Sequence, residues 1–222
     1  MNPFFSQLIR PAYRHARYVG SRLRDYSLGI TTTDECIARE FGEDFSDYYY
    51  FHRAVSFSGI HRLMRHLDPG PKDALLDIGC GAGRVICLAA QYPFSRIVGI
   101  DIDDKFCALA ERNVRSLRRC SVRPEVYCTD AATYRVPDDI TIVFLYNPFG
   151  GEVMRPVLTR VLESHDRAPR PMRLVYMNPI AHDVVMEMGR FREAEQLLLS
   201  WRPGAEWART QLVRFYDVEP RT

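Results

Sequence analysis

From residue 74 to the C-terminus, apolar residues occur in two kinds of pattern. Short apolar runs predict buried strands, and segments with an apolar residue every three or four positions predict amphipathic helices. Strands are expected at residues 74–79, 96–102, 125–130, 139–147 and 172–178. Helices are expected between them, at residues 84–92, 103–119, 151–165 and 181–189, with Pro156 as a weak point in the third.

This alternation stops after residue 190. Residues 191–201 and 210–219 both have the pattern of strands, and no helix separates them, so the loop RPGAEWA makes them an antiparallel pair. Apolar strands that alternate with helices indicate a mainly parallel sheet covered on both faces. The expected fold class is therefore α/β with three layers.

The N-terminal segment has a different character. In residues 1–30 arginines occupy several faces of a helical pattern, and a basic amphipathic helix of this kind can bind a membrane or nucleic acid. We expect its apolar stripe to pack against its own domain instead. GITTTDE predicts a cap for a following helix, and the aromatic segment after it predicts a helix that ends at Pro69-Gly70. The stripe consists of Phe5, Leu8, Ile9, Ala12, Ala16, Val19 and Leu23.

Composition narrows the class of protein. The chain has 222 residues, 46% of them hydrophobic, and a net charge of only +2, so overall charge gives no strong nucleic-acid signal. None of the six cysteines forms a C-x-x-C pair, which favours buried thiols in a reducing, cytoplasmic compartment and no metal site. No apolar run approaches the roughly 20 residues that cross a bilayer.

The stretch LLDIGCGAGR contains the most informative motif. Asp77, Gly79, Gly81 and Gly83 form D-x-G-x-G-x-G where the first strand meets a helix. Glycines there allow a tight turn and let a ligand approach backbone N–H groups. A nicotinamide dinucleotide fingerprint would have a third glycine where this chain has Arg84, which disfavours an oxidoreductase, and no P-loop motif occurs.

Two further acids end the next two predicted strands. Asp101 is placed to accept hydrogen bonds from both hydroxyls of a ribose, and Asp130 to accept one from an adenine amino group. Each could instead cap a following helix. Acids at three successive strand ends, the first followed by three glycines, favour a nucleoside site over three separate caps.

In this order LLDIGCGAGRV, VGIDID, CTDA and IVFLYNPFG resemble the motifs of class I S-adenosylmethionine-dependent methyltransferases over residues 72–180. LYNPFG and VYMNPIAHD resemble, more narrowly, a bacterial group whose substrates are mostly unassigned. The resemblance implies a Rossmann-like methyltransferase fold with a mostly parallel seven-stranded sheet in the order 3-2-1-4-5-7-6. It also implies S-adenosyl-L-methionine as the cofactor and S-adenosyl-L-homocysteine as the product.

The resemblance also assigns cofactor-binding residues. Asp101 would bind the ribose, Ile102 would lie against the adenine, and Asp130 and Ala131 would hold the adenine edge. The residues that would surround the methionine part are Asp77, Gly79, Cys80, Gly81 and Gly83.

The Asn147-Pro148-Phe149-Gly150 turn would lie beside the methyl group. Methyltransferases that act on amino groups carry (D/N)-P-P-(Y/F) there, so the resemblance implies that Asn147 contacts cofactor and acceptor and that Phe149 forms a pocket wall. This chain lacks one proline of that motif. The departure disfavours methylation of a nucleic-acid base but remains compatible with another nitrogen acceptor. Asn178-Pro179 ends the fifth strand in the same way and is expected to open a helix, so Asn147 could equally be a cap.

We therefore expect a metal-independent methyltransferase that acts on a nitrogen of a small molecule or protein. Residues 1–70 would form a helical extension or lid, and residues 71–222 the S-adenosylmethionine-binding domain. One alternative is an O-methyltransferase with a histidine base, and another is a non-catalytic module that docks a partner through residues 1–30. The candidate bases are His52, His61, His66, His165 and His182.

Overall fold

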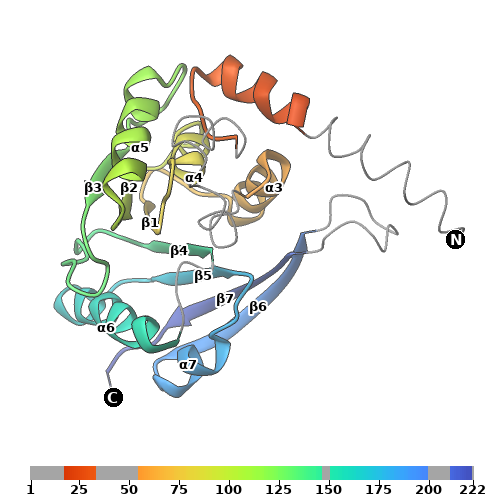
Figure 1. The fold of residues 1–222 in the computed structure, drawn as a ribbon. Helices are drawn as coiled ribbons and strands as arrows, with labels where there is room; N and C mark the ends of the chain where they lie inside the picture. Colours follow the sequence, from red (N-terminus) through yellow and green to blue (C-terminus); the bar gives the residue numbers. More distant parts are fainter. Residues whose placement is uncertain (1–17, 34–54, 147–150, 200–210, 222) are drawn as a thin grey trace, which may run out of the picture.

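The computed structural model describes residues 18–33, 55–146, 151–199 and 211–221. Its centre is a seven-stranded sheet with the order β3-β2-β1-β4-β5-β7-β6 (Figure 1). The first five strands pair in parallel, and β7 runs antiparallel to both β5 and β6. The strands are β1 (Ala74–Ile78), β2 (Arg96–Asp101), β3 (Glu125–Cys128), β4 (Ile142–Tyr146), β5 (Arg173–Met177), β6 (Phe191–Leu199) and β7 (Gln211–Val218). The predicted α/β class and strand order are confirmed.

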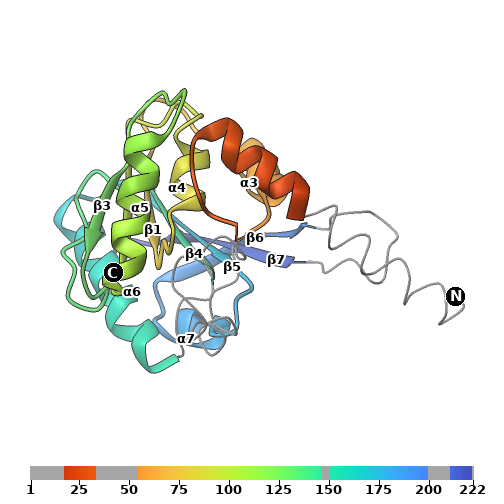
Figure 2. The same cartoon turned by 45° about the horizontal axis from the view of Figure 1, so that its top comes forward.

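Helices cover both faces of this sheet. Those of the described residues, besides residues 18–28, are α3 (Phe57–Leu67), α4 (Arg84–Ala89), α5 (Asp104–Ser116), α6 (Gly151–Arg167) and α7 (His182–Glu187). Figure 2 shows α3, α4 and α5 on one side and α6 and α7 on the other. The sequence predicted these elements to within a few residues, and α6 continues through Pro156 because its apolar side is buried.

Alternate residues of the central strands serve the two faces. Leu75 and Phe144 belong to the core under α3 and α4, whereas Leu76 and Val143 belong to the core under α6. This follows from the two-residue period of a strand, since neighbouring side chains point to opposite faces. Both faces of β1 are buried, which explains why its sequence is a continuous apolar run interrupted only by Asp77.

The structure excludes the alternative that Asp101 or Asp130 caps a helix, and the prediction that Asn178-Pro179 opens a helix was wrong. The N-cap of α5 is Asp103, whose carboxylate accepts hydrogen bonds from the backbone of Lys105 and Phe106, so Asp101 is not a helix cap. Asp130 precedes a turn, not a helix, and accepts a hydrogen bond from the backbone N–H of Ala132 at 2.8 Å. Pro179 does not begin a helix, because α7 starts three residues later at His182.

The N-terminal extension packs differently from the prediction. Residues 18–28 are helical, but Val19 and Leu23 of the expected buried stripe are 40% and 64% exposed. The buried residue of this helix is Asp25, whose carboxylate accepts hydrogen bonds from the backbone and hydroxyl groups of Thr32 and Thr33. These threonines therefore hold the chain to residues 18–28, and the helix they were expected to cap lies outside the described residues.

Candidate active site

The glycine turn joins β1 to α4 at the carboxyl end of the sheet. The backbone N–H groups of Gly79 and Cys80 both donate to the carbonyl of Ile100 on β2, at 2.9 and 3.0 Å. Gly79, Gly81 and Gly83 have φ values of 77°, 52° and 80°, a region that favours glycine. A Cβ added at Gly81 would meet no atom within 4 Å, so this glycine leaves open space beside the turn.

Asp101 connects the end of β2 to the same turn. Its carboxylate accepts hydrogen bonds from the backbone N–H groups of Gly81 at 2.8 Å and Asp103 at 3.1 Å. The side chain is buried, and the glycine turn and the ribose-binding candidate thus form one hydrogen-bonded unit. The two groups are twenty residues apart in the sequence, so the pairing of β1 with β2 is what brings them together.

Asp77 is the most unusual group of the site. Burial, with a smaller contribution from the nearby charge of Asp101, raises the pKa of Asp77 to about 8. Its Oδ2 atom is buried and has no hydrogen-bond partner among the described residues. A buried polar atom without a partner costs free energy, and a cationic ligand would relieve both this cost and the repulsion between the two acids.

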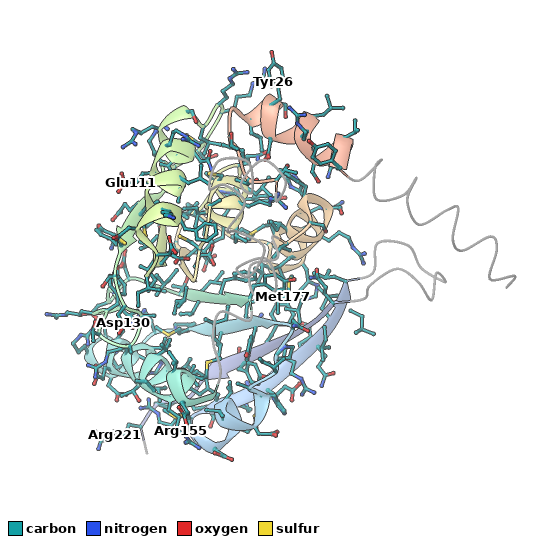
Figure 3. All side chains as sticks on the ribbon, in the orientation of Figure 1. Tyr26, Glu111, Asp130, Arg155, Met177 and Arg221 are labelled. Atoms are coloured by element: carbon teal, nitrogen blue, oxygen red, sulfur yellow. The ribbon has the colours of Figure 1, made fainter. Side chains whose placement is uncertain are left out.

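The adenine-binding candidates lie at the neighbouring strand end. Asp130 follows β3, and the intervening Thr129 donates its backbone N–H to the carbonyl of Asp101 at 2.8 Å. Asp130 is exposed at the surface (Figure 3), and Ala131 is half-buried. Ile102 is 71% exposed, which is unusual for isoleucine and leaves its side chain available to a planar group. The structure thus places all these candidates at the carboxyl ends of β1, β2 and β3.

Arg84 has a structural role that the sequence did not reveal. It is 7% exposed, its Nε donates to the Thr32 hydroxyl at 2.8 Å, and its guanidinium also donates to the Thr32 carbonyl. Another donor reaches the carbonyl of Val55 at 3.0 Å, and the guanidinium lies 4.8 Å from the centre of the Phe57 ring. The position where a dinucleotide fold has its third glycine therefore anchors the N-terminal extension.

Asn113 of α5 also joins the N-terminal extension to the glycine turn, which the sequence did not predict. Its side chain accepts a hydrogen bond from the N–H of Thr31 at 2.7 Å and donates to the Thr31 carbonyl at 2.9 Å. It also donates to the carbonyl of Ala82, inside the glycine turn, at 2.8 Å. An asparagine within an otherwise amphipathic helical pattern was the available signal, because it falls on the buried side of α5.

The predicted acceptor-contacting residues Asn147 and Phe149 lie outside the described residues. The last described residue of β4 is Tyr146, which pairs with Met177 at the end of β5 and whose hydroxyl accepts a hydrogen bond from Gln211 at 2.8 Å. Asn178, which follows Met177 as Asn147 follows Tyr146, is exposed and has a φ of 54°. The structure thus assigns Asn178 to a tight turn and not to a helix start.

The described histidines have structural contacts away from the glycine turn. His61 pairs with the Tyr92 hydroxyl at 3.0 Å, and His66 with the Glu195 carboxylate at 2.9 Å. His182 pairs with the Tyr216 hydroxyl at 2.8 Å, and His165 is buried, which lowers its pKa. His52 lies outside the described residues.

Within the described residues, no group of three or more histidine, cysteine or acidic side chains is placed to hold a metal ion. The cysteines in this part of the chain are free thiols, of which Cys80, Cys87 and Cys107 are buried. Cys80 points back to its own turn, with Sγ 3.8 Å from the carbonyl of Gly81. The absence of a metal site remains a prediction for the whole chain.

Comparison with known proteins shows which proteins this part of the chain resembles. Residues 75–171 match the family described as "Methyltransferase domain". The match begins in β1 and includes the glycine turn, Asp101 and Asp130, so the candidate cofactor residues lie within it. A ribosomal protein L11 methyltransferase from Thermotoga maritima is 38% identical over 53 residues, which are 24% of this chain and 19% of that protein.

Solved structures show the same fold. An RNA methyltransferase from Salinibacter ruber, in complex with S-adenosyl-L-homocysteine, has a TM-score of 0.58 at 19% identity and covers 77% of this chain and 96% of its own. Magnesium protoporphyrin IX methyltransferase from Synechocystis, with bound S-adenosylmethionine, has a TM-score of 0.57 at 17% identity, covering 85% and 99%. An N-methyltransferase from Bradyrhizobium japonicum has a TM-score of 0.53 at 16% identity, covering 72% and 94%.

The fold is therefore the Rossmann-like fold of S-adenosylmethionine-dependent methyltransferases. Together with the matched domain, it supports S-adenosyl-L-methionine as the cofactor of this protein. The three structural neighbours differ in the acceptor that their names describe, so the fold does not define the acceptor.

Proposed function

We propose that this protein is an S-adenosylmethionine-dependent methyltransferase that methylates a nitrogen of a small molecule or protein. The observation that carries the proposal is the hydrogen-bonded unit of the glycine turn and Asp101, with the buried Oδ2 atom of Asp77, which has no hydrogen-bond partner among the described residues, in the same site. S-adenosyl-L-methionine supplies an electrophilic methyl group on a positively charged sulfur when bound. Its cationic methionine part suits the two acids, and Gly81 leaves room for close approach of a ligand.

The predicted cofactor residues would each bind a different part of S-adenosyl-L-methionine. Asp101 would accept the ribose hydroxyls, and Asp130 and Ala131 would hold the adenine edge with Ile102 on its face. The backbone of the glycine turn, including Cys80, would surround the methionine part. Each of these roles follows from the resemblance and is supported by their location at adjacent strand ends.

The acceptor side of the proposal rests on Asn147 and Phe149. The Asn147 side-chain oxygen would accept a hydrogen bond from the target nitrogen, so that the nitrogen lone pair faces the methyl group, while Phe149 would pack on a planar part of the acceptor. An O-methyltransferase would need a base instead. The partners of His61, His66 and His182 favour the nitrogen acceptor, because these imidazoles already serve structural contacts.

Cofactor binding is tested first, by calorimetric titration of S-adenosyl-L-homocysteine. Asp101→Ala should weaken binding at least about 100-fold. This variant loses the carboxylate that would accept the ribose hydroxyls and also the hydrogen bond that restrains Gly81. Asp103→Ala is the matched control, since it removes a neighbouring carboxylate that caps α5. Normal binding by Asp101→Ala would refute the site assignment.

The acceptor is then sought with labelled cofactor in a cell extract, followed by mass spectrometry of the methylated species. Asn147→Ala should lower turnover about 100-fold through loss of acceptor orientation. Asn178→Ala is the matched control, because it changes the other Asn-Pro turn. Equal turnover in the two variants would leave Asn147 with a structural role only, and a methylated oxygen would favour the alternative. Turnover that is unchanged in the presence of a metal chelator would agree with the proposed metal independence.

A further inference from the structure

The helix of residues 18–28 presents an apolar stripe to solvent. Val19, Leu23 and Tyr26 are 40%, 64% and 77% exposed. Because successive helical residues are rotated by about 100°, these three side chains fall within an arc of roughly 60°. Asp25 lies on the opposite, buried side, and Figure 3 shows Tyr26 pointing away from the body of the protein. The stripe therefore faces outward and not into the core.

Exposed arginines lie on the helix that carries this stripe and around the end of α5. The end of the helix lies beside the end of α5, where the backbone N–H of Arg118 donates to the carbonyl of Leu28 at 2.9 Å. The Arg118 guanidinium lies 5.9 Å from the centre of the Tyr26 ring. The exposed arginines of residues 18–28 and 112–123 are Arg22, Arg24, Arg112, Arg115, Arg118, Arg119 and Arg123.

This surface concentrates the positive charge of a nearly neutral chain. Within residues 18–28 and 112–123 the only acidic side chain is Asp25, which is buried. Glu111, immediately before the second segment, pairs with Arg115 at 3.3 Å. The net charge of the whole chain is only +2, so positive charge is gathered beside the apolar stripe. We call residues 18–28 and 112–123 together the basic amphipathic surface.

We propose that the basic amphipathic surface docks the protein on an anionic lipid bilayer. An outward apolar stripe of Val, Leu and Tyr flanked by arginines matches a helix that lies in the membrane interface, with its apolar residues at the acyl boundary and its cations near the headgroups. Among the described residues no helix is long and apolar enough to cross a membrane.

RNA is the competing polyanion and fits this surface less well. Binding of single strands uses aromatic side chains on which bases stack, between cations that follow the phosphates. Tyr26 is the one aromatic residue of the exposed stripe, and the aliphatic side chains of Val19 and Leu23 offer no stacking face. These two residues gain free energy by entering an apolar phase, which a bilayer provides.

Co-sedimentation of the purified full chain with lipid vesicles tests the proposal. Binding to vesicles containing phosphatidylglycerol should exceed binding to pure phosphatidylcholine, and should fall as salt is raised. Leu23→Ser should lower the partition coefficient about tenfold through lost apolar burial. Each of Arg118→Gln and Arg119→Gln should lower it about fivefold. Leu198→Ser, at a 62% exposed leucine on β6, is the matched control and should leave binding unchanged.

Thermal unfolding and cofactor titration verify that these variants fold, which is expected because all four substituted positions are on the surface. Equal binding to neutral and anionic vesicles, or no loss in Leu23→Ser, would overturn the proposal. So would the absence of vesicle binding. Binding of a labelled single-stranded RNA that needs Arg118 and Arg119 but not Leu23, without vesicle binding, would identify RNA as the partner instead.

Discussion

Asp77 combines two properties that cost the folded protein free energy. Its carboxyl lies in the most buried strand of the sheet, and its Oδ2 atom has no described partner. Burial and the charge of Asp101 raise its pKa to about 8, so in the free protein at neutral pH the carboxyl keeps its proton. A cationic ligand would favour the ionised form, and cofactor binding and proton release should therefore be coupled.

Asp77→Asn tests this coupling. Because the folded state holds the Asp77 proton up to about pH 8 and the unfolded state loses it near pH 4, this residue lowers wild-type stability as pH rises through that window. Relative to the variant, the free energy of unfolding of the wild type should fall by up to about 1.4 kcal/mol for each pH unit in this window. Urea unfolding from pH 5 to 8 without cofactor measures the difference. Parallel stability–pH profiles of the two proteins would contradict the raised pKa of Asp77. Weaker cofactor binding by the variant would support a place for Asp77 in the cofactor site.

Gly81 and Gly83 both have a positive φ but different surroundings. A Cβ at Gly83 would meet the Ala110 Cβ at 3.2 Å and the Ile86 Cδ1 at 3.3 Å, whereas one at Gly81 would meet nothing within 4 Å. Gly83→Ala should therefore lower the free energy of unfolding by about 2 to 4 kcal/mol, through backbone strain and overpacking.

Gly81→Ala should cost only about 1 to 2 kcal/mol of stability from its backbone conformation, but at least tenfold in cofactor affinity. Denaturant unfolding and cofactor titration of both alanine variants separate the two effects. If Gly81→Ala bound the cofactor normally, the open space beside this turn would not be part of the cofactor site.

At the scale of elements, α5 connects the glycine turn to the N-terminal extension. Asn113→Ala would leave the partly buried backbone groups of Thr31 and the buried carbonyl of Ala82 without this partner, and should lower the free energy of unfolding by about 2 to 4 kcal/mol. Arg115→Ala, at an exposed position of the same helix, should change it by less than about 0.5 kcal/mol. Hydrogen exchange at Thr31 should accelerate in the first variant alone, and unchanged protection there would contradict this role of Asn113.

At the scale of the whole molecule, the two predicted domains share a hydrophobic core. The core under α3 and α4 contains residues from both sides of residue 70, and Arg84 holds residues of the extension as well. A division at residue 70 stays a prediction, and it does not separate two independent cores. The extension contributes Ile30, Val55, Phe57, Ile60, Leu63 and Met64.

A fragment of residues 71–222 should therefore lack cooperative unfolding, because this face of the sheet would lose its cover and Arg84 would lose its partners. A fragment of residues 18–222 is the control and should unfold cooperatively, since it keeps these contacts. Calorimetry of both fragments makes the comparison. A sharp transition in the shorter fragment would support two separable domains.

The sequence by itself determined the order and type of the elements, because buried strands and amphipathic helices leave local periodic patterns. It also placed the glycine turn and three acids at strand ends, since these lie within a few residues of the predicted strands. Only the tertiary structure decided which groups meet. It joined Asp101 to Gly81 through strand pairing, buried Arg84 and Asn113 against the extension, and turned Val19 and Leu23 outward. These contacts join residues far apart in the chain, and local periodicity carries no information about such pairs.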